Sequence, residues 1–383
     1  MKFFCLVLSL LLLAGCASPA VQAAAPDTIP ATAPPETTEA TQPPTTLPPD
    51  PVLTLLESMS VEDKVGQLFL IRCDPFTVLS DIETYRPGGL VLFAQDFQGQ
   101  SVDSMIQTIS SYQEAASLPL LISADEEGGS VCRVSAFPAF RSAPFPSPRS
   151  LYESGGMDAV LGVEAEKAYL LSTLGINVNL APVCDIATER GAFMYHRSLG
   201  QSPETVGQFA VETTRLMEAF GVGTVLKHFP GYGNNADTHT GTAVDRRSIE
   251  ELESRDLIPF SMAVMEGCNA IMVSHAIVTA FDETLPASLS PAVHDYLRNI
   301  MGFQGVIVPD DLVMEAISGT YGAGEAAVMA VLAGNDLLCS TEYALQYPAV
   351  LEAVNTGRIP PELLDTATER VLRWKQQLGL LEF

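Results

Sequence analysis

Basic residues are scarce in this chain of 383 residues. Its 20 lysines and arginines stand against 46 aspartates and glutamates, which gives a formal net charge of −26 at pH 7. So large an acidic excess repels nucleic acid and anionic lipid headgroups. We therefore expect neither of them to bind the protein through charge.

Cysteine is also sparse, with seven residues in all. Those after residue 50 are scattered, odd in number, and each lies in or beside an apolar run. This pattern is typical of small buried core residues and not of a disulfide framework or a zinc site. No spacing of metal ligands appears, so we expect neither a metal nor another cofactor. The residues concerned are Cys73, Cys132, Cys184, Cys268 and Cys339.

The N-terminus carries a short apolar run, from Phe3 to Leu13, preceded by Lys2. A permanent transmembrane helix needs about 20 residues, so the run indicates a secretory signal. It ends in LAGC, which resembles the lipobox of bacterial lipoproteins, and that resemblance implies lipidation of Cys16. We expect a signal peptide over 1–15 and a protein outside the cytoplasm, anchored to the bacterial cell membrane by lipid. An ordinary cleaved signal with an incidental cysteine is the alternative.

The segment that follows is rich in proline and threonine and has no hydrophobic period. Such a segment cannot bury a core and is expected to stay extended and solvated. We predict that residues 16–50 are the lipidated cysteine and a tether, and that 51–383 form a single domain.

From residue 64 onward, eight short apolar runs alternate with longer amphipathic stretches. Near-continuous hydrophobicity indicates parallel strands that helices cover on both faces. The intervening segment 202–221 reads as a helix that Ser202 caps and that stops at Gly221. Eight such repeats favour an α/β fold of the (β/α)₈ TIM-barrel type, with a doubly wound open sheet as the alternative. The runs are 65–71, 88–93, 118–125, 176–183, 223–229, 269–276, 305–311 and 335–340.

Polar and charged residues gather at the C-terminal ends of these runs. In a barrel the strand ends share one face, where the loops build the active site, so these residues are expected to meet. They are Asp125, Glu126 and Glu127 after the third run, Asp185 after the fourth, Lys227 and His228 in the fifth, Ser274 and His275 in the sixth, and Asp310 and Asp311 in the seventh.

Five segments resemble glycoside hydrolase family 3, in its bacterial β-N-acetylglucosaminidase branch. Together they cover the chain from about residue 52 to 380 and occur in the order of the family. The segments are SADEEGGSVCRV (123–134), NLAPVCDI (179–186), HRSLG (196–200), KHFPGYGNNADTHTG (227–241) and GVIVPDDLVM (305–314). The resemblance implies a retaining exo-β-N-acetylhexosaminidase that removes terminal β-linked N-acetylglucosamine from cell-wall or other glycans.

Retaining glycoside hydrolysis needs a carboxylate nucleophile and a separate proton donor. The resemblance assigns the nucleophile, which forms a covalent glycosyl intermediate, to Asp310. Asp311 would point to the opposite face if the strand persists, and would hydrogen-bond backbone. Two aspartates that merely cap the next helix are the alternative.

The proton donor is sought in the loop after the fifth run. Asp237 and His239 are two residues apart, so in an extended segment both side chains lie on one side. Asp237 can then fix the tautomer of the imidazole, which titrates near neutral pH and can both give and take a proton. The resemblance likewise implies that this Asp-His dyad is the acid/base.

Five further residues are expected to bind the sugar by resemblance. Charged groups at buried strand ends are costly without partners, so an ion-pair network that only braces the barrel mouth is the alternative. Arg133 is the most ambiguous, because it either contacts ligand or supports Asp125. The five are Asp125, Arg133, Arg197, Lys227 and His228.

Two positions depart from the branch. Tyr232 replaces its second histidine, and Pro309 replaces the serine before the aspartate pair. Tyr232 keeps a hydroxyl through which a ligand contact could survive, whereas Pro309 removes an N–H and a hydroxyl beside Asp310. The function therefore keeps alternatives on the same barrel, β-glucoside hydrolysis and phosphorolysis, as well as a non-catalytic sugar-binding lipoprotein. The presence of Asp310 and of the dyad argues against the last.

Overall fold

The computed structural model describes residues 49–383 except 234, 236–237, 239–240 and 242. Residues 49–383 form one compact unit. The expected signal peptide, Cys16 and nearly all of the tether lie outside the described residues.

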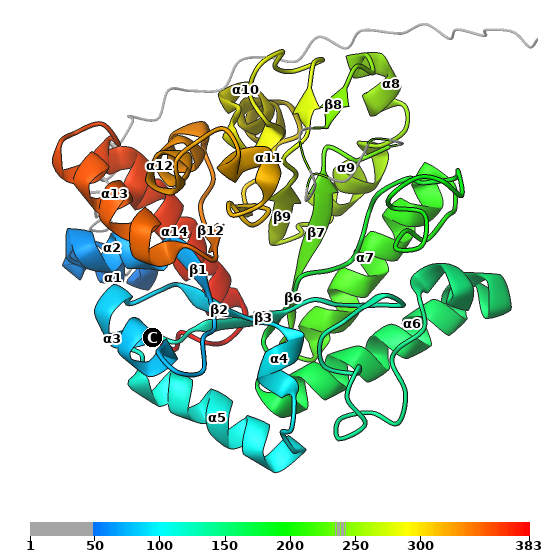
Figure 1. The fold of residues 1–383 in the computed structure, drawn as a ribbon, viewed down its shortest axis with the longest axis horizontal. Coiled ribbons are helices and arrows are strands. Elements are labelled where there is room, and N and C mark those ends of the chain that lie inside the picture. The colour runs from blue at the N-terminus through cyan, green and yellow to red at the C-terminus, as the bar shows by residue number, and fades with distance from the viewer. Residues whose placement is uncertain (1–48, 234, 236–237, 239–240, 242) are drawn as a thin grey trace, which may run out of the picture. The chain divides into compact units, whose positions relative to one another are not determined.

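Eight parallel strands form the centre of this unit (Figure 1). Their order in the sheet is β11-β9-β7-β6-β3-β2-β1-β12, so that neighbours follow the chain. The ring closes between β11 and β12, where the Ile307 carbonyl accepts the N–H groups of Asp336 and Leu337. The strands are β1 (Phe69–Arg72), β2 (Gly89–Leu92), β3 (Leu121–Ala124), β6 (Val178–Asn179), β7 (Gly223–Phe229), β9 (Ala270–Val273), β11 (Val306–Pro309) and β12 (Leu338–Ser340).

Helices surround this ring on the outside (Figure 1). They are α1 (Pro51–Ser58), α2 (Val61–Gln67), α3 (Val78–Tyr85), α4 (Ala94–Phe97), α5 (Val102–Ala115), α6 (Pro148–Leu174), α7 (Pro203–Ala219), α8 (Ile249–Glu253), α9 (Ile258–Met265), α10 (Pro291–Asp295), α11 (Glu315–Ser318), α12 (Ala323–Ala333), α13 (Tyr343–Asn355) and α14 (Pro361–Gln377). Two short pairs lie in the loops, antiparallel β4 (Glu126–Gly128) with β5 (Val131–Cys132) and parallel β8 (Val244–Asp245) with β10 (Ile277–Val278).

The predicted (β/α)₈ barrel is confirmed. Each of the eight runs contains a strand, and Ser202 caps α7 by accepting from the Thr205 N–H, as expected. One boundary was wrong, because the first run begins inside α2 and β1 starts only at Phe69. The five described cysteines are buried and free, which agrees with their interpretation as core residues.

The barrel interior is a packed core. Alternate strand residues such as Leu70, Val225 and Val308 meet there with Val371 and Trp374 of α14. At the start of β7, a Cβ on Gly223 would lie 3.0 Å from Cζ2 of Trp374, so any larger residue would require the indole to shift by a few tenths of an ångström. With this end filled, the strands' C-terminal ends are left to form the site.

Candidate active site

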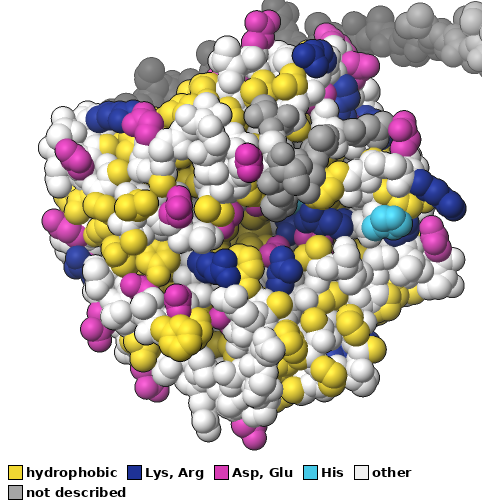
Figure 2. Space-filling view, viewed as in Figure 1, with side chains coloured by type: hydrophobic (Ala, Val, Ile, Leu, Met, Phe, Trp, Pro, Cys, Tyr) yellow, Lys and Arg dark blue, Asp and Glu magenta, His cyan; other side chains and the backbone are white. Residues whose placement is uncertain are grey.

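A cavity of about 360 Å³ opens at the C-terminal ends of the strands. Figure 2 shows it as a hollow near the centre of this face, with lysine or arginine side chains beside it. Nearly every barrel strand contributes a residue at or just after its end. The polar lining residues are Arg72, Asp125, Glu127, Arg133, Arg197, Lys227, His228, Asp310, Asp311 and Thr341.

Lys227 is buried in β7, and its charge is neutralised by two carboxylates. Its Nζ lies 2.6 Å from Oδ1 of Asp125 and 2.7 Å from Oε1 of Glu127. Burial by itself would lower the pKa of Lys227, but these two carboxylates outweigh it and hold the pKa above its ordinary value. Lys227 therefore stays charged in the cavity and keeps Asp125 oriented.

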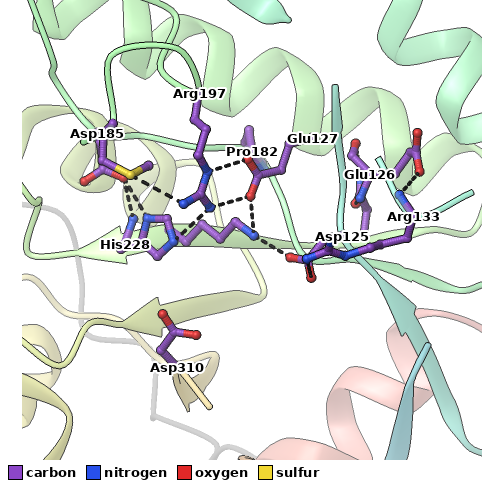
Figure 3. Close-up of polar contacts among 12 residues, drawn as sticks. Asp125, Glu126, Glu127, Arg133, Pro182, Asp185, Arg197, His228 and Asp310 are labelled. Atoms are coloured by element: carbon purple, nitrogen blue, oxygen red, sulfur yellow. Dashed lines mark hydrogen bonds and ion pairs between the residues drawn. The ribbon is translucent and has the colours of Figure 1, made fainter. Parts of the chain in front are cut away.

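Glu127 also anchors Arg197, as Figure 3 shows. The guanidinium donates from Nε to Oε2 at 2.9 Å and from a terminal nitrogen to Oε1 at 2.6 Å, a forked arrangement. Although burial opposes it, the attraction of Lys227 and Arg197 holds the pKa of Glu127 well below its usual range. Glu127 is thus a fixed anion between two cations.

His228 is held by Asp185, which follows β6. Its Nδ1 lies 2.8 Å from Oδ2 of Asp185, and the other carboxylate oxygen accepts the Tyr232 N–H at 2.7 Å. An ionised carboxylate only accepts, so Nδ1 carries the proton. Nε2 lies 3.4 Å from a terminal nitrogen of Arg197 and accepts there.

Arg133 and Glu126 have different surroundings. Arg133 reaches Asp125 only loosely, at 3.7 Å, and lines the cavity with about a third of its side chain exposed. Glu126 is buried away from the cavity and accepts the N–H groups of Arg133 and Val134 and the Ser135 hydroxyl. Glu126 therefore braces the β4–β5 hairpin.

Asp310 follows β11, and its carboxylate faces the cavity. Its Oδ1 accepts the N–H of Asp311 at 2.9 Å, and Figure 3 shows it across from the ion-pair network without a contact to it. Burial would raise the pKa of Asp310, but His228 and His275 with the Asp311 N–H outweigh it, and the pKa lies below its ordinary value. The carboxylate is therefore ionised and has oxygen lone pairs available.

Asp311 is engaged in hydrogen bonds within the protein. It accepts the N–H groups of Val313 at 3.1 Å and Thr341 at 3.2 Å, together with the Thr341 hydroxyl, and burial raises its pKa. The expected hydrogen bonds to backbone are present. The condition under which Asp311 would point to the opposite face is not met, because strand β11 ends at Pro309, and both aspartates line the cavity.

Residues 60–374 match the family described as "Glycosyl hydrolase family 3 N terminal domain". This chain belongs to glycosyl hydrolase family 3.

Two relatives carry the name beta-hexosaminidase. The protein from Nitrosomonas eutropha is 32% identical over 289 residues, 71% of this chain and 80% of its own. Beta-hexosaminidase LpqI from Mycobacterium tuberculosis is 31% identical over 330 residues, 83% of both chains. A family 3 beta-N-acetylglucosaminidase from Paenibacillus sp. str. FPU-7 superposes with a TM-score of 0.79 at 32% identity, covering 84% of this chain and 63% of that chain.

The chain is thus a family 3 glycoside hydrolase, and the residues singled out in its sequence can be placed. Asp125, Arg197, Lys227, His228 and Asp310 come together around the cavity, with Arg133 at its edge. Asp237 and His239 lie outside the described residues. The hydroxyl of Tyr232 lies 2.5 Å from the Thr238 hydroxyl and its ring packs against His228, so the hydroxyl is already engaged within the protein.

Two residues with contacts to this site, Glu127 and Asp185, are singled out by the sequence only as polar strand ends. They contact Arg197 and His228, which the sequence singled out, so each is the missing partner of an expected ligand-binding residue. Within the described ranges, no group of three or more His, Cys, Asp or Glu side chains is arranged to hold a metal ion. No helix in these ranges has the length and apolar character to cross a bilayer.

Proposed function

We propose that this family 3 enzyme is a retaining exo-β-N-acetylhexosaminidase, which releases terminal β-linked N-acetylglucosamine from cell-wall or other glycans. The observation that carries the proposal is the ionised Asp310 carboxylate, which faces a cavity whose far wall is the Asp125–Lys227–Glu127–Arg197 network. The names of the relatives support the choice of sugar. The cavity ends against the packed barrel interior, so a glycan can enter it by its end but cannot pass through it, which favours exo action.

The reaction has two steps in this proposal. An Asp310 oxygen attacks the anomeric carbon while the bond to the leaving oxygen breaks, and His239 gives its proton to that oxygen. His239, now neutral, then takes a proton from water as the water oxygen replaces Asp310 at the same carbon. Asp237 orients the imidazole. The stereochemistry is retained because the carbon is inverted twice.

Charged hydrogen-bonding groups would hold the sugar in place. Asp125 can accept from sugar hydroxyls, as can Nε2 of His228 in exchange for its 3.4 Å contact with Arg197, and Lys227, Arg197 and Arg133 can donate. Because these groups are fixed by one another before substrate arrives, little ordering is needed on binding.

The location of the enzyme is part of the proposal. LAGC at 13–16 supports lipidation of Cys16 and an extracytoplasmic position at the membrane. Wild type should then partition with membranes and Cys16→Ala should not. A wild-type protein found wholly in the medium with a free N-terminus would contradict lipidation.

Replacing Asp310 tests the catalytic role. Asp310→Ala should lower kcat by more than about 10³-fold with the fold intact, because no carboxylate remains to form the intermediate. Asp311→Ala is the matched control beside it and should instead lower the melting temperature. A 5-fluoro glycoside, which keeps the 2-acetamido group, should label Asp310. Label on Asp311, or Asp310→Ala activity within tenfold of wild type, would reject the assignment.

Substrate choice and the acid/base need separate assays. Paired chromogenic β-N-acetylglucosaminide and β-glucoside substrates, each with and without phosphate, separate the proposed activity from glucoside hydrolysis and from phosphorolysis. His239→Ala should slow poor leaving groups about 10²–10⁴-fold more than nitrophenol, and azide should partly rescue it. An equal loss on all substrates would make His239 a binding residue.

A further inference from the structure

Arg72, the last residue of β1, lines the cavity from a side that the proposed chemistry does not use. In the order of the strands, β1 lies on the opposite side of the ring from β7, which carries Lys227 and His228. Arg72 is therefore remote from Lys227 and His228, although Arg133 lies on its side of the cavity.

Arg72 makes no direct ion pair, although Asp96 is close enough for the two charges to attract each other. Among the residues that the structure describes, no carboxylate oxygen lies within 4 Å of its guanidinium nitrogens, whereas Lys227 and Arg197 each have such partners. The nearby acids bond elsewhere: Asp74 accepts the Phe76 N–H and Asp96 accepts the Phe93 N–H. A guanidinium has five N–H donors, and it is unexpected that none of those of Arg72 finds an acceptor among the described residues of so acidic a protein.

Phe93 holds this guanidinium in position. The Cζ of Arg72 lies 4.5 Å from the centroid of the Phe93 ring, and the Cζ of Arg133 lies 5.8 Å from the same centroid. The Nε of Arg133 is buried and has no hydrogen-bond partner in the described part of the chain. Two arginines with spare donors thus flank one aromatic ring, and cation–π contact limits the motion of both.

A second, more open pocket adjoins the cavity at this point. Arg72 and Thr341 line both of them, and Phe76, Gln95 and Tyr343 continue the second pocket, together with the one carboxylate among its lining residues, that of Asp74. Phe76 is 95% exposed, so its apolar face is available. Thr341 is held by its hydrogen bonds to Asp311, so the wall that the two pockets share has a fixed position.

We propose that this adjoining pocket receives the leaving group and that Arg72 binds a carboxylate on it. The inference rests on the proposed function, in which the released sugar is uncharged and lies by Asp310, so a negative charge has to come from the departing part. A guanidinium fork matches a carboxylate with two parallel hydrogen bonds. Phe76 would offer its ring to the apolar face of the same group.

Two disaccharides that differ only in the acidic group test this inference. N-acetylglucosaminyl-β-1,4-N-acetylmuramic acid carries a lactyl carboxylate that N-acetylglucosaminyl-β-1,4-N-acetylglucosamine lacks. Wild type should show the higher kcat/KM on the acidic one in phosphate-free buffer. Arg72→Gln should lower that preference by roughly tenfold, the fold-change that corresponds to one charge-assisted hydrogen bond.

Two further variants control this measurement. Arg72→Lys keeps the charge but loses the fork, and it should retain part of the preference. Arg358→Gln removes one positive charge from a surface pair with Glu325, outside both pockets, and should leave the preference as in wild type. Circular dichroism and the melting temperature report whether each variant is folded.

Each other outcome rejects the inference. No preference in wild type, or an equal loss on both disaccharides in folded Arg72→Gln, would place Arg72 against the released sugar or in no binding role. A rate that inorganic phosphate raises in wild type but not in Arg72→Gln would identify a site for free phosphate. If wild type cleaves nitrophenyl β-N-acetylglucosaminide, these results bear on Arg72 alone; if it cleaves no β-N-acetylglucosaminide, the proposed function fails and this inference with it.

Discussion

Asp185 decides which ring nitrogen of His228 carries the proton. Its Oδ2 lies 2.8 Å from Nδ1 and also accepts the backbone N–H of His228 at 3.2 Å. Nε2 is left as an acceptor that faces Arg197 and the cavity. In the neutral form of the imidazole this tautomer is the favoured one, since the other would set two donors against each other.

Asp185→Asn should therefore disturb ligand binding without removing a residue from the cavity wall. Either orientation of the amide sets its NH2 group against a backbone N–H, that of His228 or that of Tyr232, and the orientation toward His228 also moves the imidazole proton to Nε2, where it opposes Arg197. We expect kcat/KM to fall roughly 10- to 100-fold, as for the loss of a hydrogen bond to a charged group. Nitrogen NMR of the imidazole distinguishes the two orientations, because only the one toward His228 changes the tautomer.

Asp282→Asn supplies the control for this substitution, because Asp282 accepts local hydrogen bonds in a loop outside the cavity. It should leave both kcat/KM and the His228 tautomer unchanged. A folded Asp185→Asn with wild-type kcat/KM would mean that the tautomer of His228 does not matter for binding.

At the scale of elements, α6 fixes the β4–β5 hairpin through a buried ion pair. Lys167 donates from Nζ to Oε1 of Glu164 and to the carbonyl oxygen of Glu127, both at 2.7 Å. Glu127 in turn holds Lys227 and Arg197. The helix is thereby connected to the cavity through one backbone carbonyl.

Lys167→Met should destabilise the protein by about 3–5 kcal/mol, because Glu164 is left buried without its partner. The double variant Lys167→Met with Glu164→Met should recover most of that stability in urea unfolding. If Lys167 positions Glu127, kcat/KM of the double variant stays low while its stability returns. Recovery of both together would show that the pair serves stability alone.

The sequence predicted the positions of the strands better than the contacts between side chains. Buried parallel strands are continuous apolar runs, so all eight could be located, and the ring arrangement placed Asp310 and Lys227 on one face. Partner choice depends on side chains from distant loops, and for that reason Glu127 and Asp185 were not recognised as the anchors of Arg197 and His228. Arg72 was missed because it ends an ordinary strand and matches no quoted motif.

At the scale of the whole molecule, α14 closes the barrel and carries an unusual lysine. Lys375 is fully buried beside Trp374, and its Nζ donates to Oε1 of Gln67 at 2.6 Å. Among the described residues no carboxylate forms an ion pair with it. Burial lowers the pKa of Lys375 to about 7.

This lysine should make the stability of the protein depend on pH above neutrality. Unfolded lysine titrates near 10.4, so between about pH 7 and 10 the unfolded chain binds one more proton than the folded one. The free energy of unfolding should then rise with pH, by at most about 1.4 kcal/mol per pH unit, and the full cost of burying the charge is present below pH 7. Trp374 is the single tryptophan, so its fluorescence in urea reports the transition.

Lys375→Met isolates this contribution from all other titrating groups. Subtracting its free energy of unfolding from that of wild type at each pH should leave a difference that grows in favour of wild type from pH 7 toward 10 and is flat below about pH 6. The test lies in how this difference changes with pH and not in its absolute value, because the substitution also leaves Oε1 of Gln67 without a donor and so shifts the difference by a constant amount. A difference that is constant from pH 6 to 10 would mean that Lys375 stays charged when buried, and a difference that falls with rising pH would mean that an unseen acidic partner raises its pKa.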